Sequence, residues 1–94
     1  MGVFFVISTS DIVDQQRYDE YTRLARPIVE SHGGKYLLQS DNVIASKDWQ
    51  TKMIVIIEFA SKEQLDQCFQ SDEYRKIIPL REGSIVSRFV MVES

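Results

Sequence analysis

The pattern of apolar positions predicts a strand that is buried on both faces. Residues 53–59 read Met-Ile-Val-Ile-Ile-Glu-Phe, an apolar and mostly β-branched run with Glu58 as its polar member. Successive side chains of a strand point to opposite faces, so this run needs an apolar cover above and below. Residues 3–8 have the same character and predict a second strand of this kind.

A third pattern, with apolar residues at helical spacing, predicts the first helix. Asp14 is a suitable N-cap, and the apolar positions after it recur every three or four residues as far as Ser31 or His32. Gly33 and Gly34 then supply the helix stop. Pro27 lies inside this helix, where it removes one backbone hydrogen bond and is expected to kink the axis.

The second half of the chain predicts another helical layer. Ser61 and Gln64 have the spacing of a capping box, and a further helical segment is expected to begin at Ser71 and to end before Pro79. Residues 9–13 and 81–84 are expected to be loops, and 85–92 the last strand. Between the helices, a short strand at 35–39 continues at 42–45, and a hairpin turn at 46–51 leads into 53–59.

This order of strand, helix, strand, strand, helix, strand predicts an α+β fold. Two helical crossovers between parallel neighbours and one hairpin give a ferredoxin-like four-stranded antiparallel sheet, formed by a single domain over residues 1–94. Both helices then lie on one face, and the other face keeps an apolar set from the two central strands. Because monomers seldom expose so large an apolar patch, we expect a homodimer in which two subunits pack sheet to sheet as a dimeric α+β barrel.

Composition narrows the range of partners and compartments. The 94 residues carry a formal charge of −3, and their lysines and arginines are scattered, so a nucleic-acid partner is not expected. The single Cys68 cannot form an internal disulfide, and neither a signal-peptide pattern nor a membrane-length apolar run occurs. We therefore expect a cytoplasmic protein without a membrane partner. One histidine and one cysteine do not form a zinc site, and neither a metal nor a cofactor is expected.

Several short motifs carry a resemblance to a known family. They are Asp14 to Tyr21, Pro27 within the first helix, His32-Gly33-Gly34-Lys35-Tyr36, Val55 to Phe59 followed by Ser61, Ser71 to Tyr74, and Pro79-Leu80-Arg81. Together they resemble the domain of unknown function 1330 family, a member of the dimeric α+β barrel (ferredoxin-like) superfamily, over essentially the whole chain. The resemblance implies a dimeric barrel and no established activity. Relatives in the superfamily include cofactor-free monooxygenases, isomerases, haem proteins and amino-acid-sensing domains, so the fold alone selects no function.

Glu58 and Arg81 are the main candidates for a ligand site. Burial would raise the pKa of Glu58 unless a cation compensates, and the resemblance places Arg81 among the recurrent positions of the family. If the two side chains meet at a pocket mouth, Arg81 can bind a carboxylate ligand while Glu58 orients it or acts as a base. The other interpretation, which we favour, is a structural ion pair.

Three further residues are candidates with a structural alternative each. His32 can act as a general base, although a role in capping the helix end is favoured. Tyr21 can bury its ring and present its hydroxyl to a ligand or simply pack in the core. Trp49 can cover a pocket or contact the second subunit, and the subunit contact is favoured.

Two functional hypotheses follow from these candidates. In the first, the chain is a homodimer that binds a small molecule, with a carboxylate as one option, in a pocket between helices and sheet. Such a pocket is compatible with a cofactor-free oxygenase or an isomerase, and the sequence does not decide whether the chain is an enzyme. In the second, the chain is a noncatalytic dimeric interaction or regulatory module whose polar residues are structural.

Overall fold

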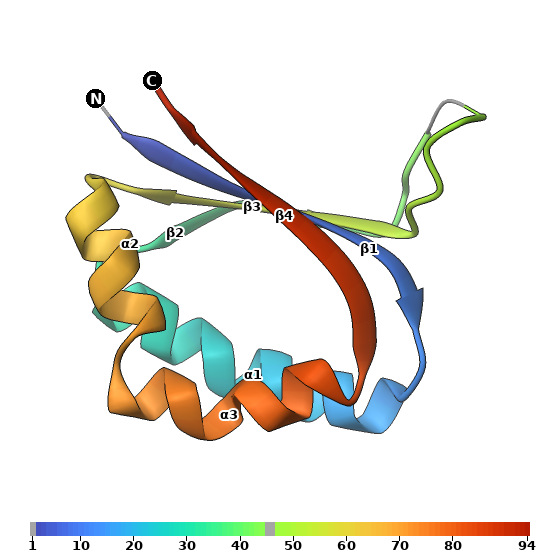
Figure 1. Ribbon diagram of the computed structural model, residues 1–94, viewed down its shortest axis with the longest axis horizontal. Coiled ribbons are helices and arrows are strands. Elements are labelled where there is room, and N and C mark those ends of the chain that lie inside the picture. The colour runs from blue at the N-terminus through green and yellow to red at the C-terminus, as the bar shows by residue number, and fades with distance from the viewer. Residues whose placement is uncertain (1, 45–46) are drawn as a thin grey trace.

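The computed structural model describes residues 2–44 and 47–94 and consists of one antiparallel sheet with helices on one face (Figure 1). Its elements in chain order are β1 (Val3–Ile12), α1 (Gln15–Ser31), β2 (Lys35–Ser40), β3 (Met53–Phe59), α2 (Lys62–Phe69), α3 (Asp72–Glu82) and β4 (Ile85–Glu93). The strands lie in the order β2-β3-β1-β4, and every adjacent pair is antiparallel. The predicted ferredoxin-like fold is thus confirmed.

The prediction of parallel neighbours was wrong. Each crossover joins two strands that run in the same direction, but another strand lies between them: β3 separates β1 from β2, and β1 separates β3 from β4. The sheet is antiparallel throughout because each crossover skips one position.

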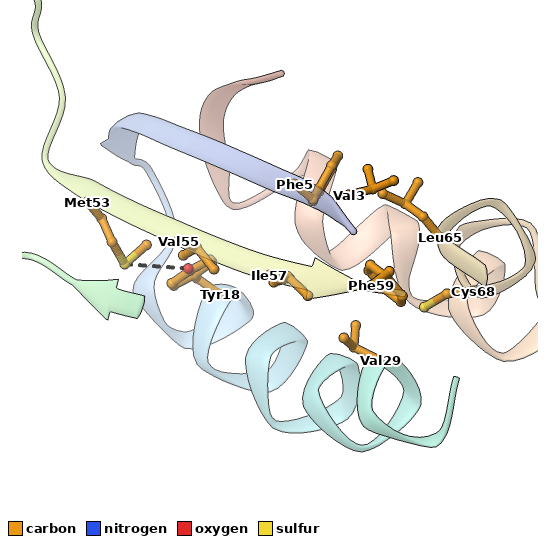
Figure 2. Close-up of a cluster of buried hydrophobic side chains, with 10 residues drawn as sticks. All are labelled: Val3, Phe5, Tyr18, Val29, Met53, Val55, Ile57, Phe59, Leu65 and Cys68. Atoms are coloured by element: carbon orange, nitrogen blue, oxygen red, sulfur yellow. Dashed lines mark hydrogen bonds between the residues drawn. The ribbon is translucent and has the colours of Figure 1, made fainter. Parts of the chain in front are cut away.

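β3 forms the centre of the core, as its apolar run predicts. Every second residue of the strand (Met53, Val55, Ile57 and Phe59) is buried against the helices. Figure 2 shows these side chains packed between Tyr18 and Val29 of α1 and Leu65 and Cys68 of α2. With roughly 25 cal/mol for each Å² of apolar surface removed from water, this face of β3 is a main source of stability.

The predicted helix starts are confirmed by their caps. The Asp14 carboxylate accepts a hydrogen bond from the Arg17 backbone N–H at 3.1 Å, and the Ser61 hydroxyl accepts one from Gln64 at 3.2 Å. The Gln64 amide oxygen in turn accepts from the Ala60 N–H at 3.2 Å, one residue before the cap. Each interaction satisfies a backbone donor that the helix itself leaves unpaired.

Several predicted boundaries were wrong, and tertiary contacts account for two of them. β1 continues to Ile12 instead of ending at residue 8, because β4 pairs with it as far as Ile12 and Ile85 across a register shift. α3 runs through Pro79 to Glu82, so residues 81–82 are helical. A proline removes only one backbone donor from a helix, and packing of the apolar side of α3 on α1 compensates for it.

The hairpin between β2 and β3 also differs from the prediction. β2 ends at Ser40, and residues 42–44 do not continue the strand. The predicted strand continuation at Ala45 and the predicted turn residue Ser46 lie outside the described residues.

The face of the sheet that points away from the helices, here called the outer face, is rich in apolar side chains. Its middle row crosses all four strands in register and consists of Leu38, Ile56, Val6 and Val90. Figure 1 shows no helix on this side of the sheet. Val90 is 56% exposed and Leu38 44%, which is unusual for aliphatic residues in the middle of a sheet.

Glu58 belongs to the outer face. It alternates with the buried residues Ile57 and Phe59 on β3, and it lies in register with Lys35 of β2 and Phe4 of β1. Its nearest charged neighbour across the strands is therefore Lys35, on the side of the sheet opposite to the helices.

Gly34 is required by close packing, and this requirement can be tested. A Cβ at Gly34 would lie 2.5 Å from Cγ1 of Val29 and 2.8 Å from a ring carbon of Phe59. Because both neighbours are fully buried, we expect Gly34→Ala to lower the free energy of unfolding by about 1–3 kcal/mol in urea titrations.

Gly33 provides the matched control. Its φ of 85° favours glycine but tolerates asparagine, and its neighbour is the Gln64 side chain. Gly33→Asn should therefore cost less than Gly34→Asn. Equal costs for the two asparagine variants would contradict the assignment of Gly34 to a packing constraint.

Candidate binding cavity

A cavity of about 300 Å³ lies between α1, α3 and the inner face of the sheet. It is present because the helices do not all pack on the strands: α3 packs on α1 through a second apolar cluster of Ala25, Tyr74 and Ile77. The floor of the cavity comes from inward-facing residues of β1, β3 and β4, among them Ile7, Val55 and Phe89. The result is a mostly apolar space of the size that ligand pockets have in proteins.

A hydrogen-bonded group of three polar side chains lies at the α1/α3 side of the cavity. The Tyr21 and Tyr74 hydroxyl oxygens are 2.7 Å apart, and an Nη1–H of Arg81 donates to the Tyr74 hydroxyl oxygen at 3.3 Å. Tyr74 is buried, whereas Tyr21 and Arg81 both line the cavity. The guanidinium and one phenol are thus held by contacts within the protein before any ligand arrives.

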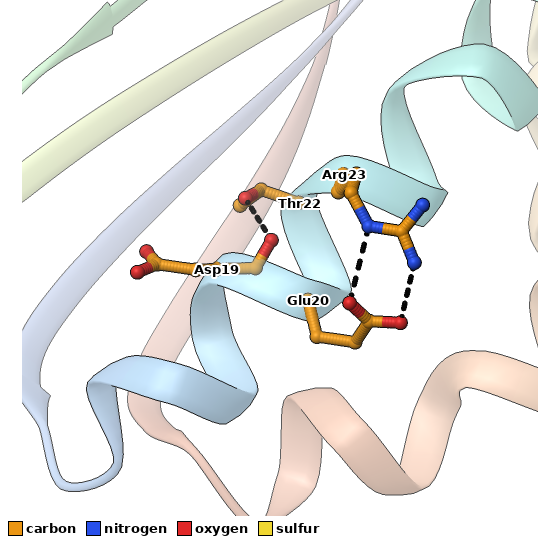
Figure 3. Close-up of polar contacts among 4 residues, drawn as sticks. All are labelled: Asp19, Glu20, Thr22 and Arg23. Atoms are coloured by element: carbon orange, nitrogen blue, oxygen red, sulfur yellow. Dashed lines mark hydrogen bonds and ion pairs between the residues drawn. The ribbon is translucent and has the colours of Figure 1, made fainter.

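α1 contributes two more arginines to the cavity lining. Arg23 makes a bidentate contact with Glu20, with N···O distances of 2.6 and 3.1 Å, on an exposed face of the helix (Figure 3). Arg26 lies with its guanidinium carbon 4.5 Å from the centre of the Tyr36 ring, a cation–π contact. Thr22 also lines the cavity, and its hydroxyl donates to the Asp19 carbonyl at 3.0 Å (Figure 3).

Arg81 differs from Arg23 in its charge balance. The carboxylate of Glu20 neutralises Arg23, but in the part of the chain that the structure describes no carboxylate lies within ion-pair distance of Arg81. Because its partner is a neutral phenol, the positive charge of Arg81 remains available to an anion in the cavity.

The tyrosines around the cavity stay protonated over a wide pH range. Burial raises the pKa of Tyr21 above its ordinary value of 10.0, and Coulombic repulsion between the ionised forms of Tyr21 and Tyr74 raises it further. Burial likewise raises the pKa of Tyr36, against the lowering effect of Arg26. Tyr21 is therefore a neutral hydrogen-bonding group at neutral pH and not a base.

The structure brings two of the predicted site residues together and separates the others. Tyr21 and Arg81 meet through Tyr74, as described above. Glu58 and Arg81 lie on opposite sides of the sheet, so both interpretations in which they meet, a pocket mouth and a structural ion pair, were wrong. Glu58 instead borders a shallow depression beside Lys35 and the chain ends.

His32 and Trp49 also lie away from the cavity. The Nδ1 atom of His32 is 2.9 Å from the Ile28 carbonyl oxygen at the C-terminal end of α1, which fits the capping interpretation. The indole N–H of Trp49 donates to the Ser8 hydroxyl at 3.2 Å, and Ser8 is in the outer-face row next to the apolar one. Trp49 thus lies at the outer face, with 57% of its surface exposed.

Sequence reasoning missed the role of Tyr74, which was not among the candidate site residues. Tyr74 and Arg81 are seven residues apart, which is two helical turns, and this spacing places them on one side of a continuous helix. The signal was present in the sequence but required α3 to continue through Pro79. Arg26 was missed as well, because its contact with Tyr36 depends on how α1 lies on β2.

Neither a metal cluster nor a membrane-spanning helix is present among the described residues. Among the described side chains, no group of three or more histidine, cysteine or carboxylate residues is gathered as a metal cluster would require. Within residues 2–44 and 47–94, no helix is both long and apolar enough to cross a bilayer.

Comparison with known proteins identifies a family and a fold. The family model described as domain of unknown function DUF1330 matches residues 3–94. A protein of unknown function from Rhodopseudomonas palustris has a similar structure, with a TM-score of 0.81, 19% identity, and coverage of 99% of this chain and 82% of that one. No curated protein matches the sequence.

Two other solved structures share the fold at lower identity. One is a DABB family protein with a ferredoxin-like fold from Mesorhizobium loti (TM-score 0.73, 10% identity, 100% of this chain and 98% of that one covered). The other is SnoaB, a cofactor-independent oxygenase from Streptomyces nogalater (TM-score 0.72, 7% identity, 99% and 92% covered). At these identities the likeness shows the fold alone.

The raised pKa of Tyr21 predicts a loss of stability in alkali. Below pH 10.0, Tyr21 is neutral in both the folded and the unfolded chain. Above that pH the unfolded chain ionises while folded Tyr21 stays neutral, so the free energy of unfolding falls as pH rises. We expect Tyr21→Phe to reduce this slope by up to about 1.4 kcal/mol per pH unit in urea titrations. Identical slopes for the two proteins above pH 10.0 would contradict the burial of this phenol.

Proposed function

Since the chain belongs to the DUF1330 family, whose domain is of unknown function, we propose a function from the cavity of this protein. The protein binds a small, largely apolar molecule that carries an anionic or carbonyl oxygen. The observation that supports this most is the guanidinium of Arg81, which lies at the wall of an apolar cavity of about 300 Å³ and has no carboxylate partner among the described residues. Arg81 is half-buried and its present partner is a neutral phenol, so a bound anion would add a charge-assisted hydrogen bond to it.

The lining of the cavity supports the proposal that the ligand is largely apolar. Ile7, Val55, Ile57 and Phe89 offer aliphatic and aromatic contacts on the sheet side. About 25 cal/mol is gained for each Å² of apolar ligand surface that leaves water, so contacts of this kind supply affinity while Arg81 and Tyr21 supply orientation.

A catalytic role is compatible with the same groups. The neighbour from Streptomyces nogalater is described as a cofactor-independent oxygenase, and enzymes of that class or isomerases gain rate from donors directed at an oxygen that becomes negatively charged. Arg81 and Tyr21 are such donors. The alternative is a noncatalytic dimeric interaction or regulatory module, in which Arg81, Tyr74 and Tyr21 only hold α3 on α1.

We also propose that the functional unit is a homodimer formed through the outer face. The middle row of this face is apolar on each strand of the sheet, and no helix of residues 2–44 and 47–94 covers it (Figure 1). The exposed Trp49 lies beside it through its bond to Ser8, where it can contact the second subunit. A second copy of the same face is the simplest cover, because a two-fold axis brings identical apolar rows together.

Removal of Arg81 tests the ligand site. A panel of small aromatic and aliphatic carboxylates is screened by thermal shift, and we expect at least one to raise the melting temperature of the wild type. Arg81→Ala should lose this shift, because loss of a charge-assisted hydrogen bond of about 1.5–3 kcal/mol weakens binding roughly ten- to hundredfold.

Arg75→Ala is the matched control, since Arg75 is an exposed arginine on the same helix and does not line the cavity. Equal shifts in both variants would remove Arg81 from the site. If no compound stabilises the wild type and Arg81→Ala only lowers the melting temperature, the noncatalytic module is the better description.

Oligomeric state tests the outer-face interface. Light scattering at micromolar concentration should give about twice the chain mass of 10.9 kDa. Val90→Lys places a charge in the middle of the apolar row and should shift the protein to the monomer. Val13→Lys, at a 61% exposed valine outside the sheet face, should leave the dimer intact. A wild-type monomer, or dissociation by both variants, would refute an interface centred on this row.

A further inference from the structure

The direction of the hydrogen bonds among Arg81, Tyr74 and Tyr21 follows from what each group can donate and accept. A guanidinium has no acceptor, so Arg81 donates and the Tyr74 hydroxyl oxygen accepts. The Tyr74 hydroxyl still has one hydrogen to donate. Among the described residues, the Tyr21 hydroxyl oxygen is the acceptor within reach, at 2.7 Å.

The opposite direction would leave a buried donor without a partner. If Tyr21 donated to Tyr74, the Tyr74 oxygen would accept two bonds and its own hydrogen would find no acceptor in the described part of the chain. Tyr74 is 3% exposed, so its hydroxyl has little access to water. A buried hydroxyl hydrogen without a partner is costly, and this cost selects donation from Tyr74 to Tyr21.

The consequence concerns the hydrogen of Tyr21. Its oxygen already accepts from Tyr74, and its side chain lines the cavity. We therefore expect the O–H of Tyr21 to point toward the cavity. Consecutive hydrogen bonds polarise one another, and this series begins at the cationic Arg81. The O–H of Tyr21 at its end is therefore a stronger donor than the O–H of an isolated phenol.

We propose that Arg81, Tyr74 and Tyr21 form a one-way hydrogen-bond chain whose last O–H is presented to the cavity, so that the site selects ligands with an acceptor oxygen. This inference rests on the proposed function and specifies its ligand class: a carboxylate, enolate or ketone oxygen on an apolar body. The hydroxyl hydrogen of an alcohol would add little affinity at this position. Ammonium groups are disfavoured because Arg81 and the Tyr21 O–H both present positive charge. Tyr21 is the group that contacts the ligand, and Tyr74 is a positioning residue.

The test compares four probes that share a phenylalkyl body and differ in their polar end. Phenylpropanoate and benzylacetone each present an acceptor oxygen, charged and neutral respectively; phenylpropylammonium presents only donors; propylbenzene has no polar end. Calorimetric titration should show that the wild type binds both acceptor probes more tightly than propylbenzene and binds phenylpropylammonium most weakly. The two acceptor probes separate the contribution of ligand charge from that of the acceptor oxygen.

Phenylalanine variants then remove single hydroxyl groups without changing the shape of the core. Tyr21→Phe should weaken both acceptor probes about tenfold and leave propylbenzene unchanged. Tyr74→Phe should reduce the affinity for the acceptor probes a few-fold, because the Tyr21 hydroxyl loses the hydrogen-bond partner that orients it. Tyr18→Phe is the matched control, since the Tyr18 hydroxyl donates to the Met53 sulfur at 3.6 Å, and it should change the acceptor probes no more than it changes propylbenzene.

Each contrary outcome has a distinct meaning. If phenylpropylammonium binds more tightly than propylbenzene and Tyr21→Phe abolishes the difference, Tyr21 donates to Tyr74 and the proposed hydrogen-bond direction is wrong. If Tyr21→Phe and Tyr74→Phe weaken all probes equally, the two phenols are only structural and the inference fails while the cavity remains a binding site. If no probe binds the wild type, the proposed function itself fails, and the inference fails with it.

Discussion

Successive side chains of a strand point in opposite directions, and in β3 both directions are apolar. One set, Met53, Val55, Ile57 and Phe59, is buried beneath the helices, and the other set, Ile54 and Ile56, lies on the outer face. The neighbouring strand β1 repeats this division in register. The sheet therefore has two apolar faces, and the helices in the described part of the chain cover only one of them. The cavity and the uncovered surface are consequences of the same alternation.

The position of the cavity depends on how unequally the helices cover the inner face. At one end of the sheet the short helix α2 packs Leu65 and Cys68 against Val3 and Phe59, and this end is closed (Figure 2). Toward the other end, small polar side chains such as Thr9 and Ser87 take part in the lining, and α3 packs on α1 instead of on the strands. The space left there is bounded by both apolar clusters. Tyr21 packs against both of them, which places its side chain at the boundary and in the lining of the cavity.

The fold could be predicted from sequence because the signals for it are local. Periodicity identified the strands and helices, and the caps at Asp14, Ser61 and Ser71 marked where helices begin. The site could be predicted only in part, because its geometry depends on tertiary contacts. Whether Glu58 faced Arg81 depended on the phase of alternation in β3, which an evenly apolar strand does not reveal. Tyr74 was missed because Pro79 was taken as a helix end, although packing on α1 stabilises the helix beyond it.

The polar chain at the α1/α3 contact is hard to explain by stability alone. Phenylalanine at positions 21 and 74 would fill nearly the same volume, and neither side chain would then require a hydrogen-bond partner in an apolar layer. The tyrosines instead need each other, and Tyr74 needs an acceptor for its hydrogen while it accepts from Arg81. A fully satisfied network of this kind adds rigidity, but this one ends at a group that lines an apolar cavity. A network built only to hold two helices together would have no reason to end there, so the arrangement favours a ligand in the cavity over a purely structural role.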